Sequence, residues 1–355
     1  MLFPNLKLPA FGLDIGDQSL KLVGLNNKFR QAKLQSFSKI TVPEGYFVDG
    51  EPKQINEIAI LIKKLIKQVV GKKIHTPYVI SVLPENKTLI TSIDVPLGLD
   101  KQKIEELIKQ KLNQYFSQKL EEIYFDWKIV STYQKQQQIL VSAAPIKTIQ
   151  LYCKILHLAG LIPLALEKES AAVTRAVIIH SKKETKKTKQ QVIIDFGATR
   201  SSIIFFYRKI IRFTSLLPIS GQQIDQLIAQ KLKITVSEAN KLKIKYDSNQ
   251  EHKLTPDIFQ PIFNEIIEKI KERLTYFQLY ISQEPIDEII LCGGGAYLMG
   301  LDQELGKQLK IKVSKANPLI NLQFSKKKDF LAFKKQSLIY ATAIGLALRN
   351  LYAQY

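Results

Sequence analysis

The chain has 355 residues, of which 45% are hydrophobic and 24% are charged, and its formal net charge is +20. At about 100–200 residues per domain this length favours two domains, and the composition excludes collagen-like, low-complexity and mostly disordered proteins. Its two cysteines, Cys153 and Cys292, cannot form a disulfide framework for a chain of this length, so a reducing compartment is expected.

The positive charge comes mainly from lysine, with 45 Lys against 7 Arg. Arginine is the side chain suited to bidentate phosphate and guanine recognition, and aromatic residues are not interleaved with the basic runs. We therefore expect a solvated surface and no nucleic-acid partner. No apolar run reaches the ~20 residues of a membrane-spanning helix, and the amino terminus does not resemble a signal peptide. A cytoplasmic protein is expected.

The amino-terminal half begins with a predicted hairpin at 11–25, because apolar residues flank a cluster of turn formers, Gly16, Asp17, Gln18 and Ser19. Helical periodicity follows at 55–70. The pattern then changes, and 77–161 reads as a small α/β unit of its own. We expect its strands near 78–83, 88–95, 123–130 and 137–144, and its helices at 101–116 and 147–158.

The carboxy-terminal half begins after 181–191, which contains five Lys and no apolar side chain. This segment predicts an exposed loop or linker, and we place the main domain boundary there. The elements expected beyond it are a second hairpin at 191–207, a strand or turn at 209–217, helices at 221–232, 236–246 and 257–280, a strand at 288–292 that leads into a glycine turn, and helices at 298–309 and 337–351.

The most informative feature is a repeat of the pattern hydrophobic-Asp-x-Gly between two strands. It occurs at Asp14 and Gly16 and again at Asp195 and Gly197. The backbone N–H groups of such turns, Gly16 to Ser19 and Gly197, Ala198, Thr199 and Arg200, can converge on phosphate oxygens. The two carboxylates would repel phosphate unless a divalent cation such as Mg²⁺ lay between them, with waters completing its ligands. The repeat therefore predicts a metal–phosphate site, with Lys21 as an additional cation.

A glycine turn, Gly293, Gly294 and Gly295 followed by Ala296, comes directly after a buried strand. Bare backbone there would allow a planar ring and a sugar to lie against the chain, although a simple strand-to-helix turn explains the same residues. Leu298 stands where a dinucleotide-binding G-x-G-x-x-G motif needs glycine, and no P-loop motif is present.

Taken together, these motifs resemble the actin-like ATPase superfamily, in which nucleotide lies between two domains built on ribonuclease-H-like sheets. Within it the chain is most similar to the PilM family of type IV pilus assembly proteins. The segments that carry this resemblance are FGLDIGDQSLKLVGL, EIYFDWKIV, ILVSAAP, LHLAGLIPLALEKESAA and IILCGGGAYLMGL. The resemblance implies an α/β fold with two actin-like domains and a small inserted subdomain. The domain ranges it implies are 1–76 with 162–180, the insert 77–161, the linker 181–191, and 192–355 with a helical part at about 221–283.

The resemblance also implies bound ATP or ADP with Mg²⁺, and the cytoplasmic amino-terminal peptide of a PilN-like membrane protein as partner, bound beside the insert. Such a protein would lie at the inner face of the cytoplasmic membrane, serve pilus biogenesis or a related type II secretion system, and have slow ATPase activity at most. Glu167, or else Glu169, falls near the place where the superfamily positions attacking water. A buried or capping carboxylate explains Glu167 equally well. Lys-rich surfaces would add attraction to anionic lipids, and self-association is left open.

One departure from the family concerns the sugar site. Relatives carry Ala-Glu-x-x-Lys on the helix that holds the ribose, whereas this chain has Asn240 in place of the Glu and retains Lys243. An amide can still hydrogen-bond to a sugar hydroxyl, but without charge assistance, so weaker ATP binding is expected. Two other functions fit the superfamily: an FtsA-like division protein, which would need an amphipathic membrane anchor, and a small-molecule kinase, which would need a general base facing its acceptor.

Overall fold

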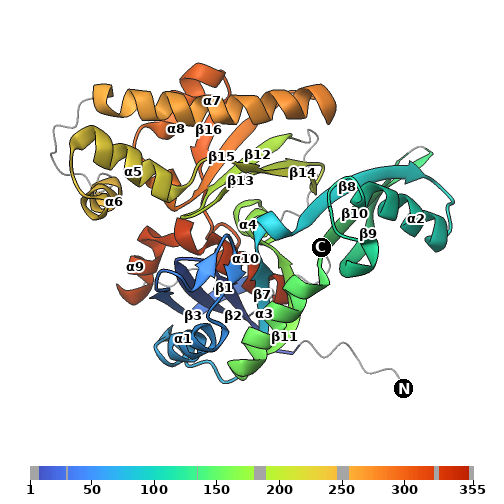
Figure 1. Ribbon diagram of the computed structural model, residues 1–355, viewed down its shortest axis with the longest axis horizontal. Helices are drawn as coiled ribbons and strands as arrows, with labels where there is room; N and C mark the ends of the chain where they lie inside the picture. The colour runs from blue at the N-terminus through green and yellow to red at the C-terminus, as the bar shows by residue number, and fades with distance from the viewer. Residues whose placement is uncertain are drawn as a thin grey trace. The chain divides into compact units, whose positions relative to one another are not determined.

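The computed structural model describes residues 8–28, 31–133, 135–179, 189–245, 256–323 and 328–351. Two compact units make up the chain: Met1–Ser181 with Pro318–Tyr355, and Lys182–Asn317. Each unit is built on one mixed β-sheet (Figure 1). Among the described residues, the helices are too short or too polar for any of them to cross a bilayer.

The sheet of the first unit has the strand order β11-β7-β1-β2-β3-β17, and β6 pairs with β3. Its strands are β1 Phe11–Ile15, β2 Ser19–Lys28, β3 Gln31–Thr41, β6 Val70–Gly71, β7 Tyr78–Leu83, β11 Ile162–Lys168 and β17 Leu322–Gln323. β11, β7 and β1 run parallel, whereas β1, β2 and β3 form antiparallel hairpins. The hairpin predicted at the amino terminus is therefore confirmed as β1 and β2, and β3 extends it.

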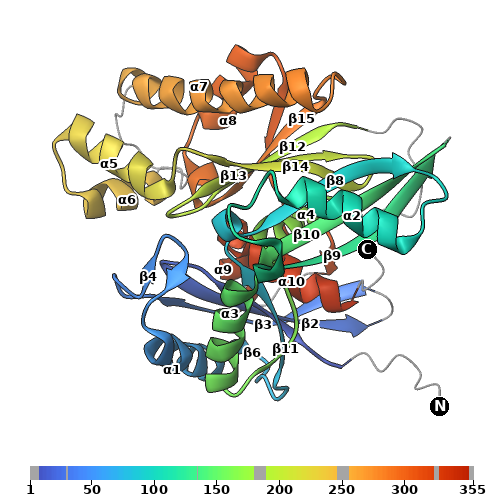
Figure 2. The ribbon, with the colours of Figure 1, turned by 45° about the vertical axis from the view of Figure 1, so that its right-hand side comes forward.

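Helices cover both faces of this sheet. They are α1 Ile55–Lys67, α3 Ile146–Leu158, α4 Glu169–Val177, α9 Lys328–Lys335 and α10 Ala341–Leu351. On one face, α1 and α3 bury the odd-numbered residues of β1 in the core, and Figure 2 shows these two helices on the same side. On the other face, Gly12 of β1 lies so close to α10 that an added Cβ would be 2.3 Å from the carbonyl oxygen of Ala343. Alternate residues of β1 thus face two different helical layers, one on each side of the sheet.

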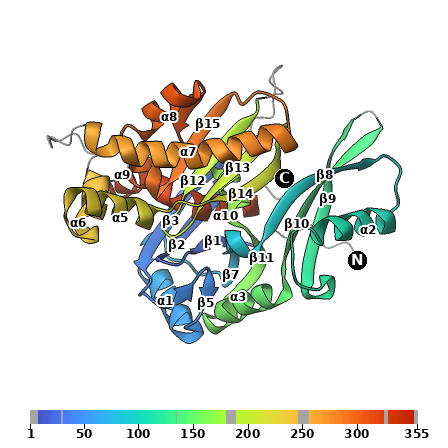
Figure 3. The ribbon, with the colours of Figure 1, turned by 45° about the horizontal axis from the view of Figure 1, so that its top comes forward.

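The insert forms a three-stranded antiparallel sheet with the order β8-β10-β9. Its elements are β8 Leu89–Pro96, α2 Lys101–Leu112, β9 Ile123–Tyr133 and β10 Gln136–Pro145. The helix α2 lies across one face of the sheet (Figure 3) and buries Ile104, Ile108 and Leu112 against it. β9 is an edge strand, and a bulge interrupts its register near Ile129. The small core of the insert is thus narrower than the expected range 77–161, because β7 pairs within the seven-stranded sheet and α3 packs in the core of the first unit.

The second unit has the strand order β14-β13-β12-β15-β16. Its elements are β12 Gln191–Phe196, β13 Ser201–Tyr207, β14 Ile210–Leu217, α5 Gly221–Leu232, α6 Val236–Lys245, α7 Pro256–Tyr280, β15 Glu288–Gly293, α8 Leu301–Leu309 and β16 Lys312–Lys315. The long helix α7 lies along the sheet, where Phe277 stacks on Phe205 of β13 with ring centroids 3.8 Å apart.

The two sheets share one topology. In each, a hairpin with a third antiparallel strand (β1-β2-β3 or β12-β13-β14) is joined to two further strands that run parallel to its first strand. The order β11-β7-β1-β2-β3 therefore corresponds to β16-β15-β12-β13-β14. Each repeated Asp-x-Gly motif lies at the carboxyl end of the strand that begins its hairpin.

The structure also corrects two other expectations about the chain's organisation. We assigned 192–355 to the second domain, but residues from Pro318 onward belong to the first unit. There β17 pairs with β3, and α10 packs against β1 and α4. The second correction concerns the segment 181–191, whose residues 181–188 lie outside the described residues. Its end is not an exposed loop, because Gln190 is buried and its backbone N–H donates to the Asp287 carboxylate at 2.8 Å.

Candidate functional site

The first hairpin places Asp14 opposite Lys21, since these residues are directly paired between β1 and β2. Lys21 Nζ lies 2.8 Å from Asp14 Oδ2, and the Asp14 side chain is almost fully buried. Asp14 therefore already has a cation as partner. This pairing explains how a carboxylate is tolerated at the end of a buried strand.

The turn itself, from Gly16 to Ser19, is half-buried. The Gly16 N–H donates to the Ser19 carbonyl oxygen at 3.3 Å, and the Gln18 carbonyl oxygen accepts from the Val42 N–H at 2.9 Å. We expected the Gly16 N–H to be one of the phosphate donors, but in this structure it closes the turn. Glycine suits this position because an added Cβ would lie 3.1 Å from the Ser19 carbonyl oxygen.

The second hairpin repeats this arrangement with two differences. Opposite Asp195 lies Ser202, not a lysine. The Gly197 N–H donates to the carbonyl oxygen of Asp195 at 3.2 Å, so this expected phosphate donor is also engaged within the turn. A Cβ at Gly197 would lie 2.2 Å from the Arg200 carbonyl oxygen, so glycine is required there. Thr199 and Arg200 are half-buried, and Ala198 is exposed.

Helix α5 holds the second hairpin in place. The N–H groups of Gly221 and Gln222 donate to the carbonyl oxygens of Gly197 and Ala198, both at 2.9 Å. Ser220 caps the helix by accepting from the Gln223 N–H. Because helix N-termini carry unpaired N–H groups, they are natural docking points for turn carbonyls. No local pattern indicated that this helix begins against the turn, because the two segments meet only in the folded unit.

The glycine turn lies beside Asp195 in the same unit, because β15 pairs in parallel with β12 and brings Cys292 opposite Asp195. Gly293 has φ +76°, and an added Cβ would lie 2.4 Å from Asp195 Oδ1. A Cβ at Gly295 would lie 2.6 Å from the Phe196 side chain. Packing against β12 thus requires glycine at both positions, independently of any ligand. Gly294 is half-buried and Ala296 is buried.

Asn240, the expected ribose residue, lies on α6 and donates from Nδ2 to Oδ2 of Asp225 at 2.7 Å. Asp225 is a buried residue of α5 that belongs to none of the motifs in the sequence. An acidic group is therefore present next to the position where relatives have Glu, but it comes from a neighbouring helix. Lys243 also belongs to α6, and its side chain is outside the described residues.

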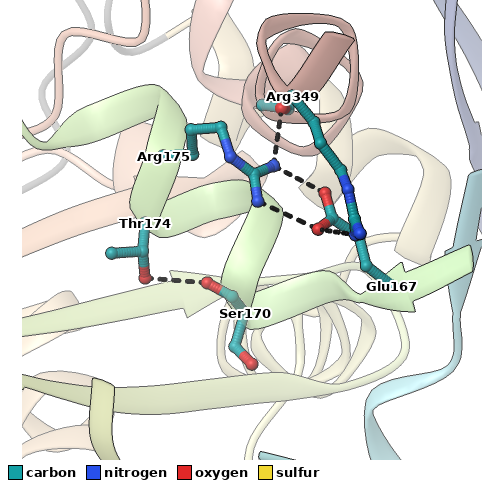
Figure 4. A network of polar contacts seen from close by, with 6 residues as sticks. Glu167, Ser170, Thr174, Arg175 and Arg349 are labelled. Atoms are coloured by element: carbon teal, nitrogen blue, oxygen red, sulfur yellow. Dashed lines mark hydrogen bonds and ion pairs between the residues drawn. The ribbon is translucent and has the colours of Figure 1, made fainter. Parts of the chain in front are cut away.

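Glu167 lies at the centre of an ion-pair network in the first unit (Figure 4). Its two oxygens accept from Arg175 of α4 at 2.6 and 2.9 Å, and Oε2 also accepts from Arg349 of α10 at 2.7 Å. Arg175 further donates to the Gly345 carbonyl oxygen at 2.8 Å. Burial alone would raise the pKa of Glu167, but the charges and hydrogen bonds of the two arginines hold that pKa below its usual value.

This network favours the structural explanation of Glu167 over a role in positioning water. The carboxylate joins β11 to α4 and α10, while Gly345 allows those two helices to touch, since its Cβ would meet the Ala172 carbonyl oxygen. Glu169 is the first residue of α4. A role of Glu167 in positioning water stays a prediction, and its observed contacts all lie within the packing of β11, α4 and α10.

Within each unit the structure brings predicted residues together. Asp14, Lys21 and the turn from Gly16 to Ser19 form the first half-site. Asp195, the turn from Gly197 to Arg200, and Gly293 to Ala296 form the second half-site. Among the described residues no group of three or more Asp, Glu, His or Cys side chains could hold a metal ion. Each half-site offers a carboxylate, an oxygen ligand of the kind Mg²⁺ prefers, so the residues fit a metal held mainly by waters and phosphate.

The duplicated sheets with their Asp-x-Gly hairpins define a protein of the actin-like ATPase fold. A chain of a PilM–PilN type IV pilus biogenesis complex superposes with a TM-score of 0.81 at 23% identity, covering 97% of this chain and 99% of that one. MreB5 of Spiroplasma citri bound to AMPPNP gives 0.55 at 11% identity, with 98% and 96% covered. The ethanolamine utilization protein EutJ from Carboxydothermus hydrogenoformans gives 0.57 at 16% identity, with 96% and 89% covered.

These structural similarities establish the fold. The family model of the type IV pilus assembly protein PilM matches residues 12–351. The chain therefore belongs to the PilM family.

Proposed function

We propose that this chain is an ATP-binding scaffold of the type IV pilus assembly platform. In this proposal Mg-ATP binds through both half-sites, and the nucleotide-bound protein presents a surface to the cytoplasmic amino-terminal peptide of a PilN-like membrane protein. Family membership supports the role in pilus assembly. The observation that carries the nucleotide proposal is the repetition of one hairpin, with aspartate and glycine at the same positions, in two sheets of the same topology.

The charges of the half-sites support a metal-bound polyphosphate. Asp14 is neutralised by Lys21, whereas the residue paired with Asp195 across the second hairpin is the neutral Ser202. A magnesium ion next to Asp195 would add to the positive charge of Arg200 in attracting phosphate oxygens to the second hairpin. The relative crystallised with AMPPNP has the same fold. ATP or ADP with Mg²⁺ is therefore the ligand that we propose for this chain.

Slow turnover is part of the proposal, because hydrolysis requires a group that aligns water with the γ-phosphorus. Glu167 was the candidate for that role, and both of its oxygens are bound by arginine. We propose that nucleotide binding, not rapid hydrolysis, is what this chain contributes.

The nucleotide proposal is tested by measuring Mg-ATP affinity for the wild type and for Asp14→Ala and Asp195→Ala. Each substitution should weaken binding at least tenfold, because each removes one carboxylate from the metal–phosphate site. Asp302→Ala on α8 is a matched control outside both half-sites and should bind like the wild type. Equal affinity of all four proteins, or no binding by the wild type, would reject the proposal.

For the partner peptide we propose the hollow between α2 and β9 in the insert. It has a volume of about 520 Å³, and apolar residues line much of it, including Leu99, Ile104, Phe125, Trp127 and Ile129. Among the described residues, no strand pairs with the outer edge of β9. An extended peptide can add to such an edge through main-chain hydrogen bonds while alternate side chains enter the hollow. The similar chain from a PilM–PilN complex motivates a PilN-type peptide as the occupant.

Ile129→Glu tests this placement, since Ile129 is half-exposed at the hollow and its replacement should not disturb the core. Fluorescence anisotropy with a synthetic peptide from the amino terminus of the cognate PilN-like protein should show at least tenfold weaker binding. Ile60→Glu on α1, another exposed isoleucine, is the control. If Ile129→Glu and the wild type bind this peptide equally, the peptide does not occupy this hollow.

We further propose that the chain acts at the inner face of the cytoplasmic membrane, where its partner would be anchored. The net charge of +20 supports attraction to anionic lipid headgroups, with about 1 kcal/mol for each lysine near the surface. Binding to vesicles that contain anionic lipid should weaken as salt is raised. Binding that is insensitive to salt would argue against this attraction.

A further inference from the structure

A second lysine extends the polar pair of the first hairpin. Strand pairing places Asp14 of β1 opposite Lys21 of β2, and Lys21 opposite Lys39 of β3. Directly opposed residues of antiparallel strands lie on the same face with Cβ atoms about 4.5–5.5 Å apart. The three side chains therefore form one row across the sheet, at the end of the sheet where the turn lies.

The position of Lys39 next to the turn is held by the backbone. Thr41 is paired with Ser19, and the Val42 N–H donates to the carbonyl oxygen of Gln18 at 2.9 Å. The end of β3 thus follows the first half-site closely. Lys39 was not singled out by the sequence motifs, because it is 25 positions after Asp14 and belongs to no Asp-x-Gly pattern.

The charges of this row are not balanced within it. Lys21 is used by Asp14, whereas no described residue offers an acceptor within hydrogen-bond or ion-pair distance of Lys39 Nζ. Partial burial, followed by the charge of Lys21, lowers the pKa of Lys39, while the residue remains exposed enough to reach a ligand. Like charges directly opposed across strands are destabilising. An anion at this place would relieve that repulsion.

Lys39 also gives the row a net positive charge. The charges of Asp14 and Lys21 offset each other in their ion pair. The ammonium group of Lys39 is therefore the excess charge of the three side chains, and it would attract a polyphosphate.

We propose that Lys39 is a second cationic contact for the outer phosphates of a nucleoside di- or triphosphate at the first half-site. This inference rests on the proposed nucleotide binding and adds a residue that determines which nucleotides bind. An ammonium group beyond Lys21 favours ligands with a phosphate chain over adenosine monophosphate, because only the longer chain can contact both lysines.

The test is isothermal titration of the full chain with Mg-ATP, Mg-ADP and AMP. Lys39→Gln should weaken binding of ATP and ADP by about tenfold, the loss expected for one charge-assisted contact. Its affinity for AMP should equal that of the wild type. Lys39→Arg keeps the charge and should retain most of the ATP affinity. Thermal melts of each variant confirm that it is folded.

Lys33→Gln is the matched control. Lys33 is an exposed lysine of the same strand, and at about 3.3 Å per residue it lies about 20 Å from Lys39. It should bind like the wild type. The role of Lys39 is refuted, while the proposed function stands, if Lys39→Gln binds Mg-ATP as tightly as Lys33→Gln does. It is also refuted if the affinity of Lys39→Gln for AMP falls as much as its affinity for Mg-ATP. If the wild type binds no nucleotide, both fail.

Discussion

Replacing Glu167 by glutamine tests whether the network around this residue is a structural element of the first unit. The substitution Glu167→Gln keeps the shape of the side chain, but it removes the negative charge and places an amide N–H₂ group against a guanidinium group. Arg175 has only 12% of its side chain exposed, so its charge would lose the Glu167 carboxylate in a nearly dry environment. Arg349 is 40% exposed and can turn toward water.

The expected loss of stability follows from these exposures. Breaking a buried ion pair by removing one partner costs about 3–5 kcal/mol, whereas the exposed arginine adds at most about 1 kcal/mol. A loss of about 3–4 kcal/mol is expected for Glu167→Gln, since the amide oxygen still accepts one hydrogen bond. For a unit of about 220 residues, each kcal/mol lowers the melting temperature by about 2–4 °C, so a decrease of roughly 10 °C is predicted.

The pH dependence has a definite sign. The folded-state pKa of Glu167 is held below the ordinary value of 4.5. Its contribution to stability is therefore fully present above that value and is lost as the pH falls through the folded-state pKa. The difference between wild type and Glu167→Gln should accordingly be large at about pH 7 and should shrink below about pH 4.

Thermal melts followed by circular dichroism at several pH values measure both effects. Glu265→Gln is the control, because Glu265 forms an exposed ion pair with Lys269 on α7 and its loss should change the melting temperature by less than about 2 °C. The structural reasoning is refuted if Glu167→Gln melts within about 2 °C of the wild type. Loss of ATP turnover without loss of stability would instead indicate that Glu167 positions water.

Three further predictions concern close packing and the sugar site. Gly293→Ala should destabilise the second unit by at least about 2 kcal/mol in urea unfolding, because φ is +76° and the new Cβ would lie 2.4 Å from Asp195 Oδ1. Unchanged stability would show that the glycine turn does not pack against Asp195 in this way. Gly345→Ala should reduce stability by several kcal/mol, because its Cβ would meet the Ala172 carbonyl oxygen. The control Gly306→Ala on α8, where the nearest neighbour of the added Cβ is 3.5 Å away, should be neutral or stabilising by up to about 1 kcal/mol. Equal melting temperatures of the two variants would contradict this packing. Asn240→Glu restores the residue of relatives but would place a second carboxylate beside buried Asp225, so a lower melting temperature is expected. Adding Asp225→Asn to this variant should recover the melting temperature. A more stable single variant would refute the pairing of Asn240 with Asp225.

Local sequence patterns were sufficient for the hairpins and most helices. They set the bounds of the α/β insert too wide, because β7 and α3 join the larger sheet and core of the first unit. Both Asp-x-Gly hairpins are formed by residues close in the chain, so turn chemistry and alternation of apolar residues predict them. The same patterns identified the two half-sites as groups of residues, since each group lies on one or two short segments. The actin-like fold was predicted from motifs that follow one another along the chain, and the structural and family similarities confirm it.

The sequence could not predict contacts between distant segments, because these depend on which elements become neighbours after folding. Arg349 reaches Glu167 across 182 positions, and α10 joins the first unit through the close approach of Gly12 and Gly345. Lys39 becomes a neighbour of Lys21 only through strand register. Asn240 is paired with Asp225 because two helices pack side by side. The residue types of the half-sites were thus readable from the chain, whereas their partners were decided by tertiary packing, which brings together groups that no local pattern relates.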